Sequence, residues 1–228
     1  MTQPSFIDAF SQSFDIDASS TALVVIDMQN ATGNRHMGLG KLLESQGQAD
    51  SASYRFDRIE SLLVPNIQRL LADFRARKGT VIYITYGAQM ADASDAPAHM
   101  KPIILATNNI AGQPEHNIVD ALQPEPTELV LNKITQGAFR STALESTLRA
   151  LGITTVVVTG VSTNNCVAMT AMEACELQYR VVVVSDGTGT DSDAMQESTL
   201  TMLRRLWARV LSTDELLDAL SASRVASS

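Results

Sequence analysis

The hydrophobic pattern of the chain is dominated by short apolar runs that are rich in β-branched residues. These runs do not alternate with polar positions, which is typical of strands buried on both faces of a parallel sheet. They cover residues 22–27, 80–85, 128–133, 154–160 and 180–186, with a weaker run at 208–212.

Between these runs the apolar residues recur at helical spacing. Residues 59–78 stop before Gly79, a typical helix C-terminal cap, and Pro65 favours a helix start at that proline. Residues 141–151 begin with a predicted capping box of Thr142 and Glu145. Three further helices are predicted over residues 164–178, 192–207 and 213–220.

Strands that alternate with helices predict a three-layer α/β/α fold, with a Rossmann-like open sheet of about six mainly parallel strands. We expect one domain over residues 1–228, in which residues 1–20 form an N-terminal extension. Two long polar stretches, residues 31–56 and 87–127, interrupt the alternation. Both follow the carboxyl ends of strands, where open α/β sheets bind their ligands, so we expect them to shape a binding site.

Composition and charge narrow the class of partner. Apolar residues make up 45% and charged residues 18% of the 228 residues, as in ordinary globular proteins, and the formal net charge is −8. This charge argues against nucleic acid and anionic membranes as partners. No run approaches the ~18 apolar residues of a membrane span, and the first residues do not resemble a signal peptide. We therefore predict a cytoplasmic protein that acts on a small molecule.

Three polar residues stand where apolar strands end. Asp27 and Lys133 end the first and third runs, and Cys166 follows the fourth after a short loop. Parallel strands place their carboxyl ends at one edge of the sheet, so these side chains can converge. Singly, each has an ordinary structural explanation: a turn cap, a solvated lysine and a small buried thiol. Together they supply a nucleophile, a cation and a proton carrier for acyl transfer, and the lysine and a helix start would lower the pKa of the thiol.

The segments that contain these residues resemble a known family. VVIDMQN, NKITQGAF and VTGVSTNNCV are similar, in order, to the three signature segments of the isochorismatase-like cysteine hydrolases. The resemblance runs from about Thr21 to the C-terminus and is weakest in the two long polar stretches. The spacing from Lys133 to Cys166 is similar to that of the branch with N-carbamoylsarcosine, ureidoacrylate and biuret amidohydrolases.

The resemblance implies a catalytic triad of Asp27, Lys133 and Cys166. It also implies a cis peptide bond between Val161 and Ser162, with the backbone N–H groups of Ser162 and Cys166 forming an oxyanion hole. In the implied mechanism Asp27 removes the thiol proton, the thiolate attacks an amide carbon, and Asp27 protonates the leaving amine. Water then hydrolyses the thioester, while Lys133 stabilises the thiolate and orients Asp27.

Six further residues at the same edge of the sheet are candidate substrate contacts: Gln29, Asn30, Tyr86, Gln136, Phe139 and Asn165. Phe139 either covers the substrate as an apolar lid or packs on the next helix. The three histidines, His36, His99 and His116, do not follow the Asp-x-His pattern of nicotinamidases. We therefore predict neither a metal nor another cofactor.

Three functions remain open at this stage. The favoured one is a metal-independent cysteine amidohydrolase that cleaves a C–N bond in a small linear amide, ureido or carbamoyl compound. The alternatives are a vinyl-ether hydrolase of the isochorismatase type and a catalytically silent binding or assembly relative. The resemblance also implies a homo-oligomer, a dimer or tetramer. The second cysteine, Cys175, is expected mid-helix as a packing residue, too far around the helix to form a disulfide with Cys166.

Overall fold

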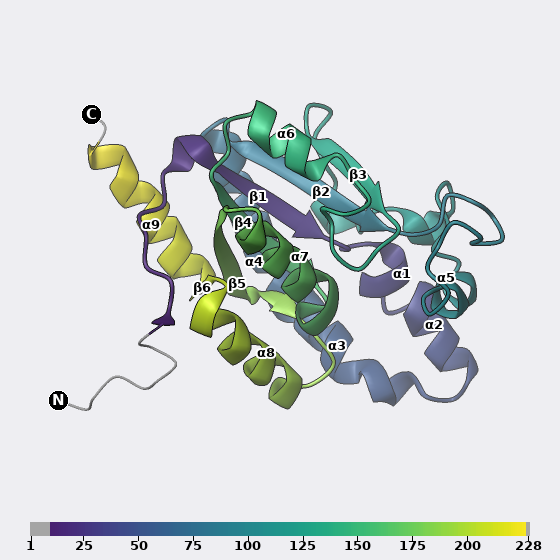
Figure 1. Ribbon diagram of the computed structural model, residues 1–228. Helices are drawn as coiled ribbons and strands as arrows, with labels where there is room; N and C mark the ends of the chain where they lie inside the picture. The colour runs from purple at the N-terminus through teal and green to yellow at the C-terminus, as the bar shows by residue number, and fades with distance from the viewer. Residues whose placement is uncertain (1–9, 227–228) are drawn as a thin grey trace.

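The computed structural model describes residues 10–226, so the first nine residues of the predicted N-terminal extension lie outside the described part. Its centre is a six-stranded sheet in the order β3-β2-β1-β4-β5-β6, in which every pair of neighbours is parallel (Figure 1). The predicted three-layer fold is confirmed. The strands are β1 (Thr21–Ile26), β2 (Thr80–Tyr86), β3 (Leu129–Lys133), β4 (Thr155–Val161), β5 (Arg180–Gly189) and β6 (Arg209–Leu211).

The central strands read as continuous apolar runs because both of their faces are covered. In β1, Leu23 and Val25 enter one hydrophobic core, whereas Ala22, Val24 and Ile26 enter the other. All six residues of β1 are buried. The alternation of a half-exposed strand is therefore absent from the sequence.

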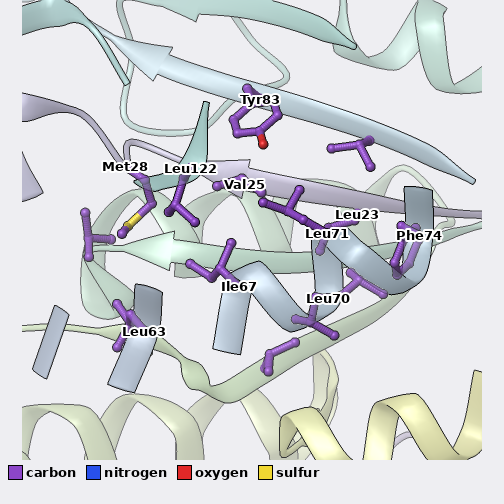
Figure 2. Packing of buried hydrophobic residues seen from close by; sticks show 14 of the residues in the cluster. Leu23, Val25, Met28, Leu63, Ile67, Leu70, Leu71, Phe74, Tyr83 and Leu122 are labelled. Atoms are coloured by element: carbon purple, nitrogen blue, oxygen red, sulfur yellow. The ribbon is translucent and has the colours of Figure 1, made fainter. Parts of the chain in front are cut away.

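One face of the sheet is covered by a long helical stretch and by the C-terminal helix. The stretch consists of α3 (Ser53–Arg58), a π-helical turn (Ile59–Leu63) and α4 (Val64–Ala76), and the C-terminal helix is α9 (Thr213–Ala226). Figure 2 shows side chains of α4 packed against β1 and β2. The opposite face carries α6 (Leu144–Ala150), α7 (Ala168–Glu176) and α8 (Asp193–Leu206) (Figure 1).

One predicted helix start agrees with the structure to within one residue, and the other is wrong. Helix α4 begins at Val64, with Pro65 in its first turn, where proline is tolerated because the backbone N–H needs no acceptor. A π-helical turn precedes it, so helical structure extends further back than the proline. Helix α6 begins only at Leu144, and the backbone N–H of Leu144 donates to the Thr142 hydroxyl at 3.0 Å. Glu145 pairs with Arg149 one turn later, so the expected capping box does not form.

The two long polar stretches contain short helices at the carboxyl edge of the sheet (Figure 1). Residues 31–56 include most of α1 (Asn30–Gly33) and all of α2 (Gly38–Ser45). Residues 87–127 include α5 (Lys101–Ala106). The part of the chain that the structure describes also contains 3-10 turns at Ala18–Ser20, Ala49–Ala52, Pro114–His116 and Asp120–Leu122. None of the helices described has both the length and the apolar character needed to cross a membrane.

Candidate active site

The site lies where the order of strands reverses. Chain order runs outward in both directions from the adjacent pair β1 and β4, and open α/β sheets bind ligands beyond the carboxyl ends of such a pair. Asp27 directly follows β1, and Cys166 follows β4 by a few residues. The topology therefore brings a carboxylate and a thiol together although they are far apart in sequence.

The backbone at Asp27 is held in an unusual conformation. Its φ is 51°, a left-handed value that aspartate tolerates better than most residues. The Asp27 N–H donates to the Ile84 carbonyl oxygen at 2.8 Å, and the Thr32 hydroxyl donates to the Asp27 carbonyl oxygen at 2.6 Å. Beside it, Gly160 has a φ of 104°, and a Cβ at this position would collide with the Ile26 carbonyl oxygen. The two strand ends approach each other closely because residue 160 has no side chain.

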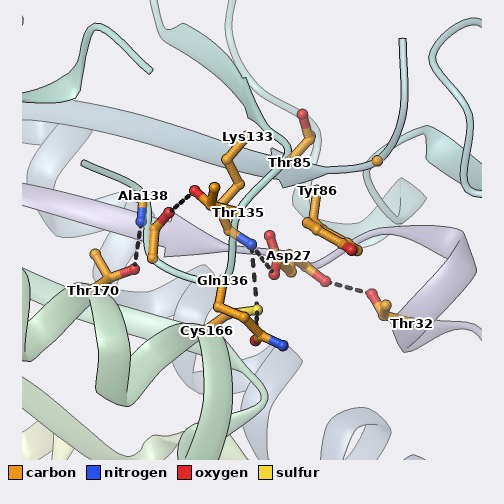
Figure 3. Close-up of polar contacts among 12 residues, drawn as sticks. Asp27, Thr32, Thr85, Tyr86, Lys133, Thr135, Gln136, Ala138, Cys166 and Thr170 are labelled. Carbon is orange, nitrogen blue, oxygen red and sulfur yellow. Dashed lines mark hydrogen bonds and ion pairs between the residues drawn. The ribbon is translucent and has the colours of Figure 1, made fainter. Parts of the chain in front are cut away.

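Lys133 reaches the site from the edge strand β3, across the end of β2. It is paired in register with Tyr86, and its ammonium lies 4.4 Å from the centroid of that ring. Nζ donates to Asp27 Oδ2 at 2.9 Å and to Cys166 Sγ at 3.3 Å, as Figure 3 shows. The Lys133 side chain is fully buried. The structure therefore joins the three candidate catalytic residues through one ammonium group.

Cys166 lies in a π-helical turn, Thr163–Val167, that leads into α7. The peptide bond between Val161 and Ser162, which precedes this turn, is cis. The backbone N–H groups at the start of a helix lack intrahelical acceptors, and Cys166 lies in this first turn. Its thiol donates to Gln136 Oε1 at 3.5 Å, and Gln136 Nε2 donates to Met100 Sδ at 3.2 Å.

Burial and mutual attraction set the charges of Asp27 and Lys133. Burial raises the pKa of the Asp27 carboxyl, although the nearby Lys133 ammonium opposes this shift. Burial also disfavours the charge of Lys133, but Asp27 and Cys166 outweigh it, so the pKa of the lysine is raised. Lys133 is thus a permanent cation at neutral pH, and Asp27 accepts a proton more readily than an exposed aspartate does.

The expected lowering of the Cys166 pKa is wrong. Burial and the adjacent Asp27 carboxylate raise the pKa of the thiol from 9.0 to about 12, and Lys133 offsets only part of this rise. The sequence indicated the lysine and the helix start but not the burial of Cys166, which is only 9% exposed. In the resting site the sulfur is therefore a protonated thiol, and a thiolate forms when Asp27 takes its proton.

A small cavity of about 130 Å³ opens onto these groups. Drug-sized ligands occupy cavities of roughly 300 Å³ or more, so this cavity suits a smaller molecule. Of the predicted contacts, Tyr86, Gln136 and Asn165 line the cavity together with Ser162. Two buried side-chain polar atoms in the described part of the chain lack a hydrogen-bond partner, Asp27 Oδ1 and the Tyr86 hydroxyl, and both residues line this cavity.

The other three predicted contacts do not line the cavity. Gln29 is fully buried, accepts a hydrogen bond from the Tyr86 N–H at 2.7 Å and so fixes the end of β2. Asn30 donates to the Pro114 carbonyl oxygen at 3.0 Å. The Phe139 ring packs 6.0 Å from the ring of Tyr179, so it is a packing residue of the second core and not a lid.

The sequence did not reveal several residues that line the cavity. The most notable is Arg55 of α3, whose side chain is 6% exposed. It lies on the same buried face as Ala52, Phe56 and Ile59. A charged residue among these apolar positions was the one feature of the sequence that could have indicated its role. Others come from the two long polar stretches: Ala31, Thr32, Leu39, Met100, Ile103, Ile104, Thr107 and Asn109.

The histidines do not gather in one place. His116 Nε2 lies 2.8 Å from Asn132 Oδ1, outside the cavity lining, and neither His36 nor His99 lines the cavity. Among the residues that the structure describes, no group of three or more His, Cys, Asp or Glu side chains could hold a metal ion.

Comparison with known proteins gives consistent matches. Residues 21–215 match the isochorismatase domain family. A ureidoacrylate amidohydrolase RutB of Methylorubrum extorquens is 32% identical over 199 residues, which cover 81% of this chain and 76% of the relative. An isochorismatase family protein from Desulfovibrio vulgaris has a TM-score of 0.74 at 30% identity, over 89% of this chain and 99% of its own. N-carbamoylsarcosine amidase from Thermoplasma acidophilum has a TM-score of 0.64 at 25% identity, over 86% and 98%.

Proposed function

Because the chain belongs to the isochorismatase family and is a hydrolase of carbon–nitrogen bonds, we propose that it cleaves a small linear amide, ureido or carbamoyl compound through a thioester on Cys166. The observation that carries the proposal is the Lys133 ammonium, which donates to both Asp27 and Cys166. This contact makes the carboxylate and the thiol two ends of one proton-transfer unit.

The first step is a proton transfer from the Cys166 thiol to the Asp27 carboxylate. It moves one negative charge from oxygen to sulfur, and both atoms are hydrogen-bonded to the same ammonium. The attraction of Lys133 for this charge is therefore kept during the transfer. The raised pKa of Asp27 favours its protonated form, so a thiolate can form in a site where the resting thiol has a pKa of about 12.

The thiolate then attacks the carbonyl carbon of the substrate, and the carbonyl oxygen becomes an oxyanion. The N–H groups of Ser162 and Cys166 stabilise this oxyanion. When the C–N bond breaks, Asp27 returns its proton to the leaving nitrogen, which departs as ammonia or an amine and leaves a thioester on Cys166. Water loses a proton to Asp27 and attacks the thioester, the C–S bond breaks to release a carboxylic or carbamic acid, and Asp27 returns the proton to the departing Cys166 sulfur, which restores the thiol.

The size and lining of the cavity support a small substrate. Its volume is about 130 Å³, and the Tyr86 hydroxyl and Asp27 Oδ1 supply two polar atoms without partners in the described residues. A bound amide or ureido group carries both N–H donors and a carbonyl acceptor, so it can satisfy both atoms.

Release of ammonia from a panel of linear amides, ureides and carbamoyl compounds tests the proposal. The native chain should release ammonia from at least one of them, and Cys166→Ser should abolish this release with an unchanged circular dichroism spectrum. Mass spectrometry of a quenched reaction should detect the acyl group on the peptide that contains Cys166. Release of pyruvate from isochorismate without any amidase activity would instead assign the vinyl-ether reaction.

A further inference from the structure

The segment that follows the candidate catalytic lysine has no regular structure of its own. Residues 134–143 connect β3 to α6 and form neither a helix nor a strand in the described part of the chain. The segment nevertheless places the Gln136 carboxamide in the cavity, where Oε1 accepts from the Cys166 thiol at 3.5 Å. A side chain on such a segment keeps one position only if other contacts fix the backbone that carries it.

Helix α7 provides these contacts. The Thr170 hydroxyl accepts from the Ala138 N–H at 3.1 Å, as Figure 3 shows. Glu173 Oε2 accepts from the Phe139 N–H, also at 3.1 Å. Thr170 and Glu173 are three residues apart and therefore lie on one face of the helix. The turn that leads into the same helix carries Cys166. Helix α7 thus fixes the candidate nucleophile and, at the same time, the segment that contacts it.

Gly137 lets the Glu173 carboxylate pack directly on the backbone of this segment. A Cβ at residue 137 would collide with the carboxylate carbon and with both of its oxygens. A hydrogen bond from a backbone N–H to a charged carboxylate is also about twice as strong as one between neutral groups. Within the described part of the chain the carboxylate enters no ion pair. Its contacts therefore serve the segment, and they depend on the glycine.

We propose that Glu173 is a positioning residue that holds Gln136 against Cys166, and so controls both the resting thiol and the binding of the substrate. In the resting site Gln136 Oε1 accepts from the protonated thiol and stabilises that form. When a substrate enters, the same carboxamide offers it an acceptor and two donors. The second part rests on the proposed function for the identity of the substrate, whereas the first part does not.

The reactivity of Cys166 tests the first part without a substrate. The assay is the rate of reaction with methyl methanethiosulfonate at pH 7, in proteins that carry Cys175→Ala so that one cysteine reports. In Glu173→Ala the carboxamide should leave the thiol, whose protonated form then loses a hydrogen bond. The rate should rise about threefold to tenfold, the range for one neutral hydrogen bond. Glu173→Gln keeps an acceptor at the same place and should restore most of the native rate.

Combined variants separate positioning from a general loosening of the site. Gln136→Ala should raise the rate as much as Glu173→Ala does, and the double variant should be no faster than either single variant. Gly137→Ala should act like Glu173→Ala, because its Cβ displaces the carboxylate, and should add nothing once residue 173 is alanine. Gly137→Ala also replaces Glu173→Ala if that variant does not fold. Glu176→Ala removes an exposed glutamate from the same helix and should leave the rate unchanged.

Turnover tests the second part. With any linear amide, ureide or carbamoyl compound from which the native chain releases ammonia, Glu173→Ala should raise KM about threefold to tenfold, because the substrate loses one hydrogen bond. The value of kcat should stay within about twofold of the native value, since Asp27 and Lys133 keep their ion pair and the lost contact is made equally before and during the reaction.

Several results overturn the positioning role: a native reaction rate in both Glu173→Ala and Gly137→Ala, a rate in Glu173→Gln as high as in Glu173→Ala, or a similar rise in Glu176→Ala. A rise in Glu173→Ala that persists on top of Gln136→Ala does so too, because the helix then acts on the thiol without the carboxamide. A loss of kcat at constant KM refutes the part that concerns the substrate. A chain with the expected thiol rates that releases no ammonia from any compound keeps the positioning role and refutes the proposed function.

Discussion

Removal of the Asp27 carboxylate should make Cys166 more reactive toward thiol reagents while it abolishes turnover. The carboxylate is one of the two main causes of the raised thiol pKa, the other being burial. In Asp27→Asn the Lys133 ammonium remains beside the sulfur without a competing anion, and the pKa of Cys166 should fall. The same substitution removes the group that carries protons to and from the substrate.

The structure gives the size of this effect. Asp27 and Cys166 accept hydrogen bonds from the same Nζ at 2.9 and 3.3 Å, so the two groups lie within about 6 Å of each other. Two unit charges at that distance repel by roughly 3 kcal/mol at an effective dielectric constant of about 20. This repulsion corresponds to about two pKa units of the thiol, and hence to about a hundredfold more thiolate at pH 7.

The assay is the rate of reaction with methyl methanethiosulfonate, a small neutral reagent without an amide group. All proteins carry Cys175→Ala, so that one cysteine reports, and a variant that also carries Cys166→Ala gives the background. With the native aspartate, the rate should rise about tenfold per pH unit from pH 6 to pH 10 without levelling, because the thiol pKa is about 12. With Asp27→Asn, the rate at pH 7 should be about a hundredfold higher.

The slope against pH separates reactivity from access, since a buried sulfur reacts slowly at every pH. A rate that levels below pH 8 in the protein with Asp27 would show that the resting sulfur is already a thiolate. A rate in Asp27→Asn no greater than in its parent would show that the carboxylate does not control the thiol. Either result refutes the reasoning.

Three further predictions concern the charges and the backbone of the site. The pH profile of kcat/KM should fall on the acid side through an apparent pKa above the ordinary 3.8, because burial raises the pKa of Asp27 and only its ionised form accepts the proton. On the alkaline side kcat/KM should stay level to pH 10, because the pKa of Lys133 is raised above 10.5. Lys133→Met should lower the free energy of unfolding, measured in urea, by about 3–5 kcal/mol, because it leaves a buried unpaired carboxylate. The double variant Lys133→Met/Asp27→Asn should regain most of that stability without regaining activity. A Lys133→Met variant as stable as the native chain would contradict this reasoning. Gly160→Ala should destabilise the fold by on the order of 3 kcal/mol in the same assay, because φ is 104° and the new Cβ collides with Ile26, whereas Gly152→Ala, with open space around the residue, should cost less.

The fold could be predicted from the sequence because its central strands are buried on both faces. Runs such as Thr155–Val161 have no polar face, and that feature is confined to a few architectures. The convergence of Asp27, Lys133 and Cys166 followed from one rule, that parallel strands end at the same edge of the sheet. No knowledge of the loops was needed for either inference.

What the sequence could not supply depends on tertiary contacts. Burial of the sulfur reverses the shift that the lysine alone would cause, and burial is a property of the whole site. Phe139 was ambiguous because an apolar residue beside a site can face the substrate or a helix, and its contact with Tyr179 decides the matter. Arg55 and the residues of α5 reach the cavity from separate long stretches, whose path no local pattern predicts.

The catalytic groups and part of the cavity lining come from different segments of the chain. The catalytic groups stand on the ends of the central sheet, whereas α5 contributes Ile103 and Ile104 from a six-residue helix. Ile104 packs in a small cluster with Tyr86, Ala88 and Ala93, separate from the two main cores. Changes in α5 can therefore alter which molecules fit, but a change at Ile104 also acts on Tyr86, whose ring lies 4.4 Å from the Lys133 ammonium. Most of the chemistry thus depends on the ends of the sheet strands, whereas much of the cavity lining comes from the long stretches, so substitutions in these stretches can change the substrate while Asp27, Lys133 and Cys166 stay in place.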